Sequence, residues 1–211
     1  MATIITFATS KGGSGKSVLA FNLYGAFRSM NVPVAVIDDD PQQTITKMGR
    51  IAERYGGPPL DVLDAGTDVG SLRKREDYRV IIVDTRGYAT QEVNPWIQYS
   101  HVVIVPCRAS LSDIGEIGTT LAKVAQARQT NPTLKAGIVL NATRYASRGF
   151  EADIRQMLES QPAPIFATQI AERVSYQRSP LDGGTVFDTN DDKAQDEIRR
   201  MGIEILNLLK T

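Results

Sequence analysis

Short, continuous runs of apolar and β-branched residues recur along this chain, separated by stretches with helical periodicity. The runs at 34–37 and 80–83 are apolar at every position, which is typical of strands covered on both faces. Strands are predicted near residues 3–8, 34–38, 60–64, 79–84, 101–106, 135–141 and 164–168. Helices are predicted near 16–30, 41–55, 67–77, 89–98, 111–130, 149–160 and 192–209, with Pro41 in the first turn of the second. This alternation predicts an α/β fold: a doubly wound, mostly parallel sheet with helices on both faces.

The composition is that of an ordinary globular protein. The chain has 211 residues, 42% of them hydrophobic and 23% charged, which predicts a single domain over residues 1–211. No helix-turn-helix pattern precedes the first predicted strand, so sequence-specific operator binding is not expected. Basic and acidic residues number 24 each, so any binding to nucleic acid has to come from a local basic patch.

The single cysteine, Cys107, excludes an intramolecular disulfide and a cysteine-based metal site within one chain. Cys107 and the one histidine, His101, lie in the same apolar run, where structural roles are favoured. No apolar run is long enough to span a membrane, and the N-terminus leads directly into a strand without a secretory signal. A cytoplasmic location is therefore expected.

The sequence Ser-Lys-Gly-Gly-Ser-Gly-Lys-Ser at residues 10–17 follows the first predicted strand and opens the first predicted helix. This is the setting of a phosphate-binding loop, in which several backbone N–H groups and the helix dipole point at one anion. Lys16 is expected to reach the terminal phosphates, and the Ser17 hydroxyl to ligate Mg²⁺. The backbone of the loop is supplied by Gly12, Gly13, Ser14 and Gly15.

The loop departs from the general pattern at its start, where Ser10 replaces a glycine and Lys11 adds a second lysine. A lysine at that place points away from its own nucleotide pocket and needs another role. The arrangement Lys-Gly-Gly-x-Gly-Lys-Ser resembles the deviant loop of the ParA/MinD group of P-loop ATPases, and the chain is most similar to the short ParF-like plasmid partition ATPases. The resemblance implies ATP as the ligand and an ATP-dependent homodimer, in which Lys11 reaches the partner's nucleotide.

The second predicted strand ends in Asp38-Asp39-Asp40, at the edge where parallel α/β sheets bind ligands. Alternation along the strand places Asp38 and Asp40 on one side, with Asp39 turned away. Such a pair beside a triphosphate can hold Mg²⁺ through its waters and position the attacking water. The alternative is that Asp40 caps the next helix. The run resembles the family's Asp-x-Asp-Pro-Gln motif, which implies that Asp40 is the hydrolytic residue and that Asp38 belongs to the Mg²⁺ shell.

The fourth predicted strand ends in Asp84-Thr85-Arg86-Gly87. An acid after an apolar strand fits the Walker B role of supporting Mg²⁺, and an ordinary strand-end carboxylate is the alternative. Gly87 is expected to let a backbone N–H approach the γ-phosphate. Many relatives have Thr-Pro-Pro after this aspartate, so Arg86 is a departure whose contact with phosphate, partner or solvent stays open.

Asn141 ends the sixth predicted strand. A side-chain amide both donates and accepts hydrogen bonds, which suits an adenine edge. The family has an asparagine in a comparable place, which implies base recognition by Asn141. A turn-forming asparagine is the alternative.

Basic residues become more frequent after residue 141. In ParA-like proteins, basic residues of the C-terminal half form a surface for non-specific DNA, so the resemblance implies a DNA surface here; a solvated face is the alternative. The candidates are Arg144, Arg148, Arg155, Arg173 and Arg178.

The last predicted helix carries apolar residues at helical spacing, among them Ile198, Met201 and Ile205. In MinD-like relatives a basic amphipathic tail binds membrane. Here Glu197 and Glu204 accompany the basic residues of the helix, so packing into the core is favoured and no membrane partner is expected.

The sequence therefore indicates a ParA-like ATPase for plasmid or chromosome partition. ATP is expected to join two subunits whose combined basic surface binds DNA without sequence preference, on the nucleoid. A centromere-binding adaptor of the ParB/ParG type would stimulate an intrinsically slow hydrolysis. The alternatives are the same ATPase positioning a protein cargo such as a carboxysome or chemoreceptor cluster, or aiding conjugative transfer, or a MinD-like membrane-associated division regulator.

Overall fold

The computed structural model describes residues 1–87, 94–108, 110–144 and 148–211. The strands are β1 (Thr3–Phe7), β2 (Val34–Asp39), β3 (Val62–Leu63), β4 (Val80–Thr85), β5 (Val102–Arg108), β6 (Lys135–Thr143) and β7 (Ile165–Ala171). The α-helices are α1 (Lys16–Ser29), α2 (Thr44–Arg54), α3 (Val69–Leu72), α4 (Pro95–Tyr99), α5 (Leu111–Ala127), α6 (Arg148–Leu158), α7 (Val174–Arg178) and α8 (Asp192–Leu208). Two 3₁₀ helices, Ser179–Asp182 and Val186–Asp188, connect α7 to α8.

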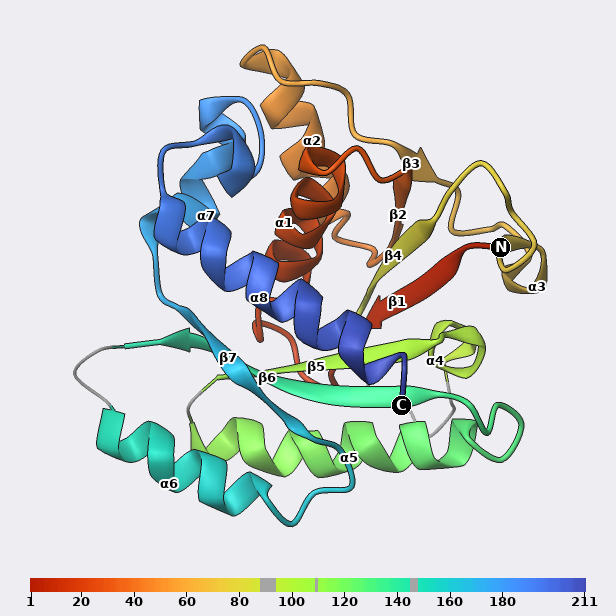
Figure 1. Ribbon diagram of the computed structural model, residues 1–211, viewed down its shortest axis with the longest axis vertical. Coiled ribbons are helices and arrows are strands. Elements are labelled where there is room, and N and C mark those ends of the chain that lie inside the picture. The colour runs from red at the N-terminus through yellow and green to blue at the C-terminus, as the bar shows by residue number, and fades with distance from the viewer. Residues whose placement is uncertain (88–93, 109, 145–147) are drawn as a thin grey trace.

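These strands form one sheet in the order β3-β2-β4-β1-β5-β6-β7, and every neighbouring pair is parallel. Helices α1, α2, α7 and α8 cover one face, and α5 and α6 cover the other (Figure 1). The predicted α/β class with a doubly wound sheet is confirmed. Because β1 lies between β4 and β5, the chain crosses to both sides of β1, which opens a crevice at the carboxyl ends of the central strands.

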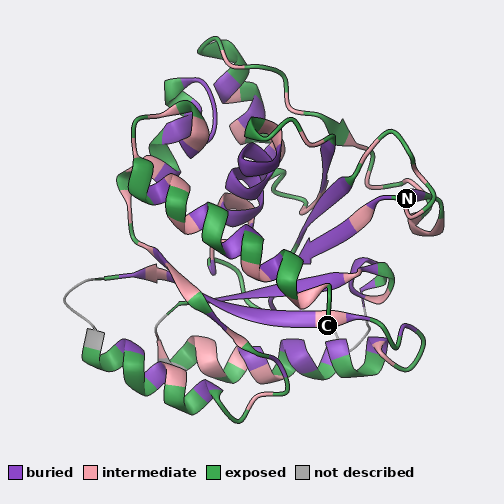
Figure 2. Cartoon of the chain, viewed as in Figure 1, coloured by how far each residue is buried: buried purple, intermediate pink, exposed green. Residues whose placement is uncertain are grey.

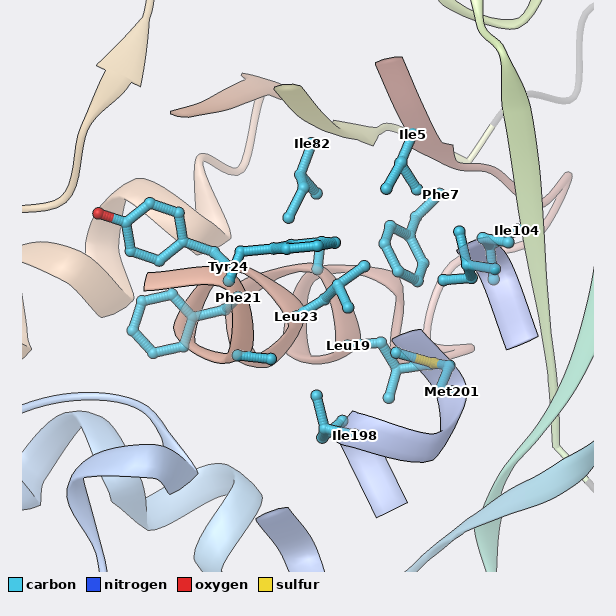
Figure 3. Close-up of a cluster of buried hydrophobic side chains, with 14 of the residues drawn as sticks. Ile5, Phe7, Leu19, Phe21, Leu23, Tyr24, Ile82, Ile104, Ile198 and Met201 are labelled. Atoms are coloured by element: carbon cyan, nitrogen blue, oxygen red, sulfur yellow. The ribbon is translucent and has the colours of Figure 1, made fainter. Parts of the chain in front are cut away.

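The core fills both faces of the central strands. Ile5 and Phe7 of β1 pack toward α1 and α8 in one cluster, whereas Ile4 belongs to a separate cluster on the opposite face. Figure 3 shows Leu19 of α1 and Met201 of α8 among the side chains of the first cluster. This packing fixes the start of α1, and hence the loop before it, against the sheet.

Helix α8 packs into this core as the sequence predicts. Ile198, Met201 and Ile205 are fully buried, while Ile203 and Leu206 lie on the exposed side of the helix. Figure 2 shows the same division between buried and exposed positions along α8. Within the described ranges, no helix is both long and apolar enough to cross a bilayer.

The edge strand β7 is covered by side chains from both layers. The Glu204 carboxylate of α8 accepts hydrogen bonds from the backbone N–H groups of Ala167 (2.7 Å) and Thr168 (2.8 Å). The Arg155 guanidinium of α6 donates to the carbonyls of Phe166 (2.8 Å) and Ala167 (3.2 Å). These contacts satisfy backbone groups that an edge strand otherwise leaves open to another chain.

His101 and Cys107 have structural roles, as expected. The backbone N–H of Ile4 donates to Nδ1 of His101 (2.9 Å), so this imidazole is a fixed acceptor at the start of β5. Burial, followed by the nearby charge of Arg73, lowers the pKa of His101. Cys107 is buried inside β5, and burial raises the pKa of its thiol to about 12.

Several predicted element boundaries are wrong for local reasons. Helix α2 begins at Thr44 rather than 41, because residues 40–43 form a turn in which the N–H of Gln43 donates to the carbonyl of Asp40 (2.7 Å). Pro41 therefore lies before the helix. The predicted helix near 67–77 is reduced to the single turn of α3. The predicted helix near 89–98 appears as α4 at 95–99, and residues 88–93 lie outside the described ranges.

Candidate functional site

Residues 8–15 connect β1 to α1 at the carboxyl edge of the sheet. Gly15 occupies the N-cap of α1 with φ of 92°, in the left-handed region, and a Cβ there would lie 2.1 Å from Nδ2 of Asn141. Only glycine fits both constraints. Because Gly15 has no side chain, the first N–H groups of α1 have no side-chain cap in the described structure, and the end of the helix suits an anion.

Lys16 lies beneath this loop. Its Nζ donates to Oγ1 of Thr9 (3.1 Å) and reaches the carbonyl of Lys11 (3.5 Å), and the residue is 6% exposed. Burial lowers the pKa of Lys16, and the charges of Asp84 and Asp40 oppose this shift. Thr9, which the sequence analysis did not single out, also donates from Oγ1 to the carbonyl of Lys11 (2.7 Å) and so ties the loop to the end of β1.

Asp84 is a fully buried carboxylate beside the loop. Neither of its oxygens has a hydrogen-bond partner of normal geometry in the described structure. Burial raises the pKa of Asp84 to about 7; the nearby Ser17 hydroxyl and Lys16 ammonium oppose the rise, and the charges of Asp38 and Asp40 add to it. A buried, unpartnered carboxylate is costly, which indicates a site prepared for a positive ligand.

Asp38 lies directly opposite Asp84 in the register of β2 with β4. Its Oδ2 accepts hydrogen bonds from the backbone N–H of Thr46 (2.9 Å) and its hydroxyl (2.8 Å), which hold the start of α2. Its Oδ1 is buried and has no hydrogen-bond partner in the described structure. One carboxylate oxygen of Asp38 therefore holds the start of α2, and the other has no hydrogen-bond partner in the described structure.

These oxygens fit a hard divalent cation. Carboxylate oxygens of Asp84 and Asp38 and the Ser17 hydroxyl are the ligand types that Mg²⁺ prefers. Within the described part of the chain, no group of three or more His, Cys, Asp or Glu residues is placed to hold a metal alone. Most of the ligands of a cation here would have to be water and phosphate oxygens, as is usual for Mg²⁺ bound with a nucleotide.

Asp40 lies in the turn that follows β2. Its Oδ1 accepts a hydrogen bond from the N–H of Gln42 (2.8 Å), while the N-cap of α2 is Gln43. The alternative of a helix-capping Asp40 is therefore wrong. The charge of Asp40 acts to raise the pKa of both Lys16 and Asp84, so Asp40 lies at the same crevice. Its hydrolytic role stays a prediction.

Lys11 is exposed and turns toward the N-terminus of α5. Its Nζ lies 3.0 Å from Oδ1 of Asp113 and 3.1 Å from Oγ of Ser112. Ser110 caps α5 by accepting from the N–H of Asp113 (3.2 Å). Asp113 was not among the predicted site residues, although Ser-x-x-Asp before a helical pattern is a capping signature that places it at a helix start.

The residue at the non-standard first position of the loop, Ser10, also contacts α5. Its N–H donates to Oγ1 of Thr120 (3.1 Å), and its hydroxyl donates to the carbonyl of Glu116 (3.2 Å). On the other side, a Cβ on Gly87 would lie 3.0 Å from the backbone nitrogen of Gly12. The chain that leaves β4 thus passes directly against the loop, where the sequence predicts a γ-phosphate contact by Gly87. Arg86, beside it, is exposed.

Asn141 lies within β6 rather than in a turn, and its Nδ2 donates to the carbonyl of Ser14 (2.7 Å). Beside it is a cleft, lined on one side by Gly15 and Val18 and on the other by the segment after β7. Asn141 is thus in contact with the loop and on the wall of an adjoining cleft, and its role in base recognition stays a prediction.

Two of the five candidate DNA-binding arginines are engaged inside the protein. Arg155 binds two carbonyls of β7, as described above. Arg173 forms an ion pair with Glu197 of α8, with Nη2 and Oε1 2.6 Å apart and the Arg173 side chain 25% exposed. Both contacts join elements of the fold, which gives these residues a role that does not require DNA.

The other three candidates lie just after β6, at the start of α6 and at the end of α7. The exposed Arg144 pairs with Glu172, and the exposed Arg178 pairs with Asp182 at 3.3 Å. Arg148 is the first residue of α6, and its side chain lies outside the described structure. The binding of DNA by these three residues stays a prediction.

Comparisons with known proteins agree with this arrangement. The family model described as "CobQ/CobB/MinD/ParA nucleotide binding domain" matches residues 5–186. The chain is 25% identical over 211 residues to the maintenance of carboxysome distribution protein A of Halothiobacillus neapolitanus, with 97% of both chains covered. It is also 25% identical over 189 residues to protein ParA of Rhizobium radiobacter, with 87% of this chain and 84% of that protein covered.

A similar fold is found among solved structures. A plasmid partition protein of Borrelia burgdorferi B31, bound to AMPPNP, superimposes with a TM-score of 0.71 at 17% identity. The match covers 98% of this chain and 99% of that one. At this identity the likeness shows that the fold is shared.

Proposed function

Because the chain belongs to the CobQ/CobB/MinD/ParA nucleotide binding domain family, we propose that it is a ParA-like ATPase that partitions plasmid or chromosomal DNA. The observation that carries this proposal is the pair of lysines on one loop. Lys16 is buried beneath the loop, whereas Lys11 is exposed and directed outward. One loop therefore offers a cation to its own ligand and a second cation to another molecule.

The proposed ligand is ATP with Mg²⁺. The N–H groups of the loop and Lys16 bind the phosphates, and Asn141 lies where the base would be contacted. Ser17, Asp38 and Asp84 hold Mg²⁺, which neutralises phosphate charge when bound. Asp40, in the turn beside them, orients the attacking water. The AMPPNP bound by the Borrelia plasmid partition protein, an ATP analogue, supports this choice of nucleotide.

The proposed active form is an ATP-dependent homodimer in which Lys11 reaches the partner's phosphates. Lys11 would have to leave Asp113, to which it is bound at the surface. An exposed ion pair of this kind contributes about 0–1 kcal/mol, so the exchange costs little. The contact is thus compatible with a lysine that changes partners between two states.

The proposed cargo is DNA, bound without sequence preference by the dimer. With 24 basic and 24 acidic residues, one chain has no net attraction to DNA, and joining two weak patches raises the effective affinity. Arg144, Arg148 and Arg178 are the better candidates, because Arg155 and Arg173 bind within the fold. A centromere-binding adaptor would stimulate hydrolysis and release the dimer from the nucleoid; the relative named ParA supports this assignment.

Fluorescence anisotropy of a labelled random-sequence duplex tests this proposal. The Asp40→Ala variant, which should bind ATP without hydrolysing it, is expected to bind the duplex with ATP and not with ADP. Arg148→Glu should weaken that binding. Glu159→Lys, the opposite charge change at the residue that follows the other end of α6, serves as the comparison variant. DNA binding that is independent of the nucleotide would contradict the proposal.

A second candidate function keeps the ATPase and changes the cargo to a protein assembly. The observation that favours it is the carboxysome distribution relative, whose alignment covers 97% of both chains. The two functions differ in the adaptor, so affinity capture by the ATP-bound Asp40→Ala variant would separate them. A MinD-like membrane role is disfavoured, because the apolar face of α8 is buried in the core.

A further inference from the structure

The end of β7 and the segment that follows it form one wall of the cleft beside the phosphate-binding loop. This wall consists of Ala171, Glu172, Arg173, Tyr176 and Gln177, and it faces Gly15, Val18 and Asn141 across the cleft. We propose that Glu197 of α8, which contacts this wall from behind, is a positioning residue for the base and sugar of the nucleotide. The inference rests on the proposed nucleotide binding and adds the residue that shapes this part of its site.

Glu197 binds three different positions of the wall. Its carboxylate accepts hydrogen bonds from the backbone N–H of Ala171 (3.2 Å), from the Arg173 guanidinium (2.6 Å) and from the Tyr176 hydroxyl (2.8 Å). These residues belong to the end of β7, the following loop and α7. One carboxylate, whose side chain is 17% exposed, thus fixes three successive parts of the wall relative to α8.

The rest of α7 is attached to the same end of α8. The Tyr176 hydroxyl also contacts the carbonyl of Ala194 (3.0 Å), and the Ser175 hydroxyl donates to Asp191 (2.6 Å), the N-cap of α8. Ile198, the next residue after Glu197, is fully buried against α1. The wall is therefore held by a helix that is itself anchored in the core behind the loop.

The contacts of Glu197 also control the charge that faces the cleft. Arg173 lines the cleft, and its ion pair with Glu197 holds the guanidinium against α8. Without the carboxylate, this cation would be free to turn toward the phosphates. Loss of Glu197 is therefore expected to weaken contacts with the base and sugar without weakening those with the phosphates.

Glu204 provides a matched control on the same helix. It also binds two backbone N–H groups of β7, at Ala167 (2.7 Å) and Thr168 (2.8 Å), but neither residue lines the cleft. A carboxylate that only secures the edge strand should affect stability in the same way at both positions. Glu197 differs from Glu204 in that it also binds Arg173 and Tyr176, two residues that line the cleft.

Isothermal titration of Glu197→Gln, Glu204→Gln and wild type compares AMPPNP with inorganic tripolyphosphate, each with Mg²⁺. Glu197→Gln is expected to weaken AMPPNP binding about tenfold, as for loss of a charged hydrogen-bonding group, and tripolyphosphate binding less than about twofold. Glu204→Gln should leave the ratio of the two affinities unchanged. Tyr176→Phe, which removes the hydroxyl contacts to Glu197 and Ala194 and keeps the ring, should change the ratio in the same direction, by a smaller factor.

An affinity ratio in Glu197→Gln and Tyr176→Phe equal to that of wild type would overturn the positioning role while leaving the proposed function intact. A wild-type protein that binds tripolyphosphate and AMPPNP equally would also overturn it, because the cleft would then contribute nothing to binding. A wild-type protein that binds neither ligand would overturn the proposed function and this inference together.

Discussion

Replacing Asp84 by asparagine should stabilise the ligand-free protein and abolish its binding of Mg²⁺ with a nucleotide. Asp84 is fully buried, and neither of its oxygens has a hydrogen-bond partner of normal geometry in the described structure. Its pKa rises from 3.8 to about 7, so ionisation is less favourable in the folded protein than in the unfolded chain. The proposed role of Asp84 in holding Mg²⁺ would account for a carboxylate kept at this cost.

The magnitude follows from the size of the pKa shift. The shift from 3.8 to about 7 spans about three pH units, which corresponds to about 4 kcal/mol. The sign is fixed by linkage: stability is highest below pH 3.8, falls as the unfolded carboxyl ionises, and is fully reduced above pH 7. A buried asparagine amide without partners costs about 1–3 kcal/mol, so we expect a net gain of about 1–3 kcal/mol at pH 8.

Urea unfolding of wild type and Asp84→Asn in EDTA, at pH 5 and at pH 8, measures this difference. Between these conditions the advantage of the variant should grow by about 3 kcal/mol, because the wild-type carboxyl ionises in the fold only near pH 7. The apolar variant Asp84→Leu controls for the amide. An advantage that does not change with pH, or a variant that is less stable at pH 8, would refute the reasoning.

Three further predictions concern other parts of the site and fold. Asp113→Asn should strengthen the ATP-dependent dimer by up to about fivefold in sedimentation equilibrium, because it releases Lys11 from a surface ion pair; weaker dimerisation would contradict this. His101→Gln should reduce the loss of stability as pH falls below 6.5, because the pKa of the histidine is lowered in the fold, and an unchanged urea midpoint profile would count against it. Gly15→Ala should lose nucleotide binding in calorimetry, because its Cβ would lie 2.1 Å from Asn141; binding within twofold of wild type would exclude that clash.

The fold and the phosphate-binding loop were predictable from sequence because their signals are local. Continuous apolar runs mark strands that are buried on both faces, and the spacing of glycines and lysines at 10–17 defines the loop without reference to the rest of the chain. The burial of Ile198 and Met201 also followed from helical spacing alone.

The contacts that assign roles to charged side chains were not predictable, because they join distant residues. Lys11 meets Asp113 across 102 positions, and Arg173 meets Glu197 across 24. The sequence does not distinguish an arginine that faces solvent from one that binds within the fold, as Arg155 does. The start of α2 was predicted too early, at residue 41. Asp40 instead closes a turn with Gln43, and Pro41 is compatible both with this turn and with the first turn of a helix.

The central claim is that ATP joins two subunits through Lys11. Size-exclusion chromatography with light scattering, run with ATP and with ADP, tests it most directly on Asp40→Ala and on Asp40→Ala combined with Lys11→Ala. With ATP, and not with ADP, Asp40→Ala is expected to have twice the monomer mass of 23.1 kDa. The double variant is expected to be a monomer with either nucleotide. A monomer in every state, or a dimer that forms equally with ADP or without Lys11, would contradict it.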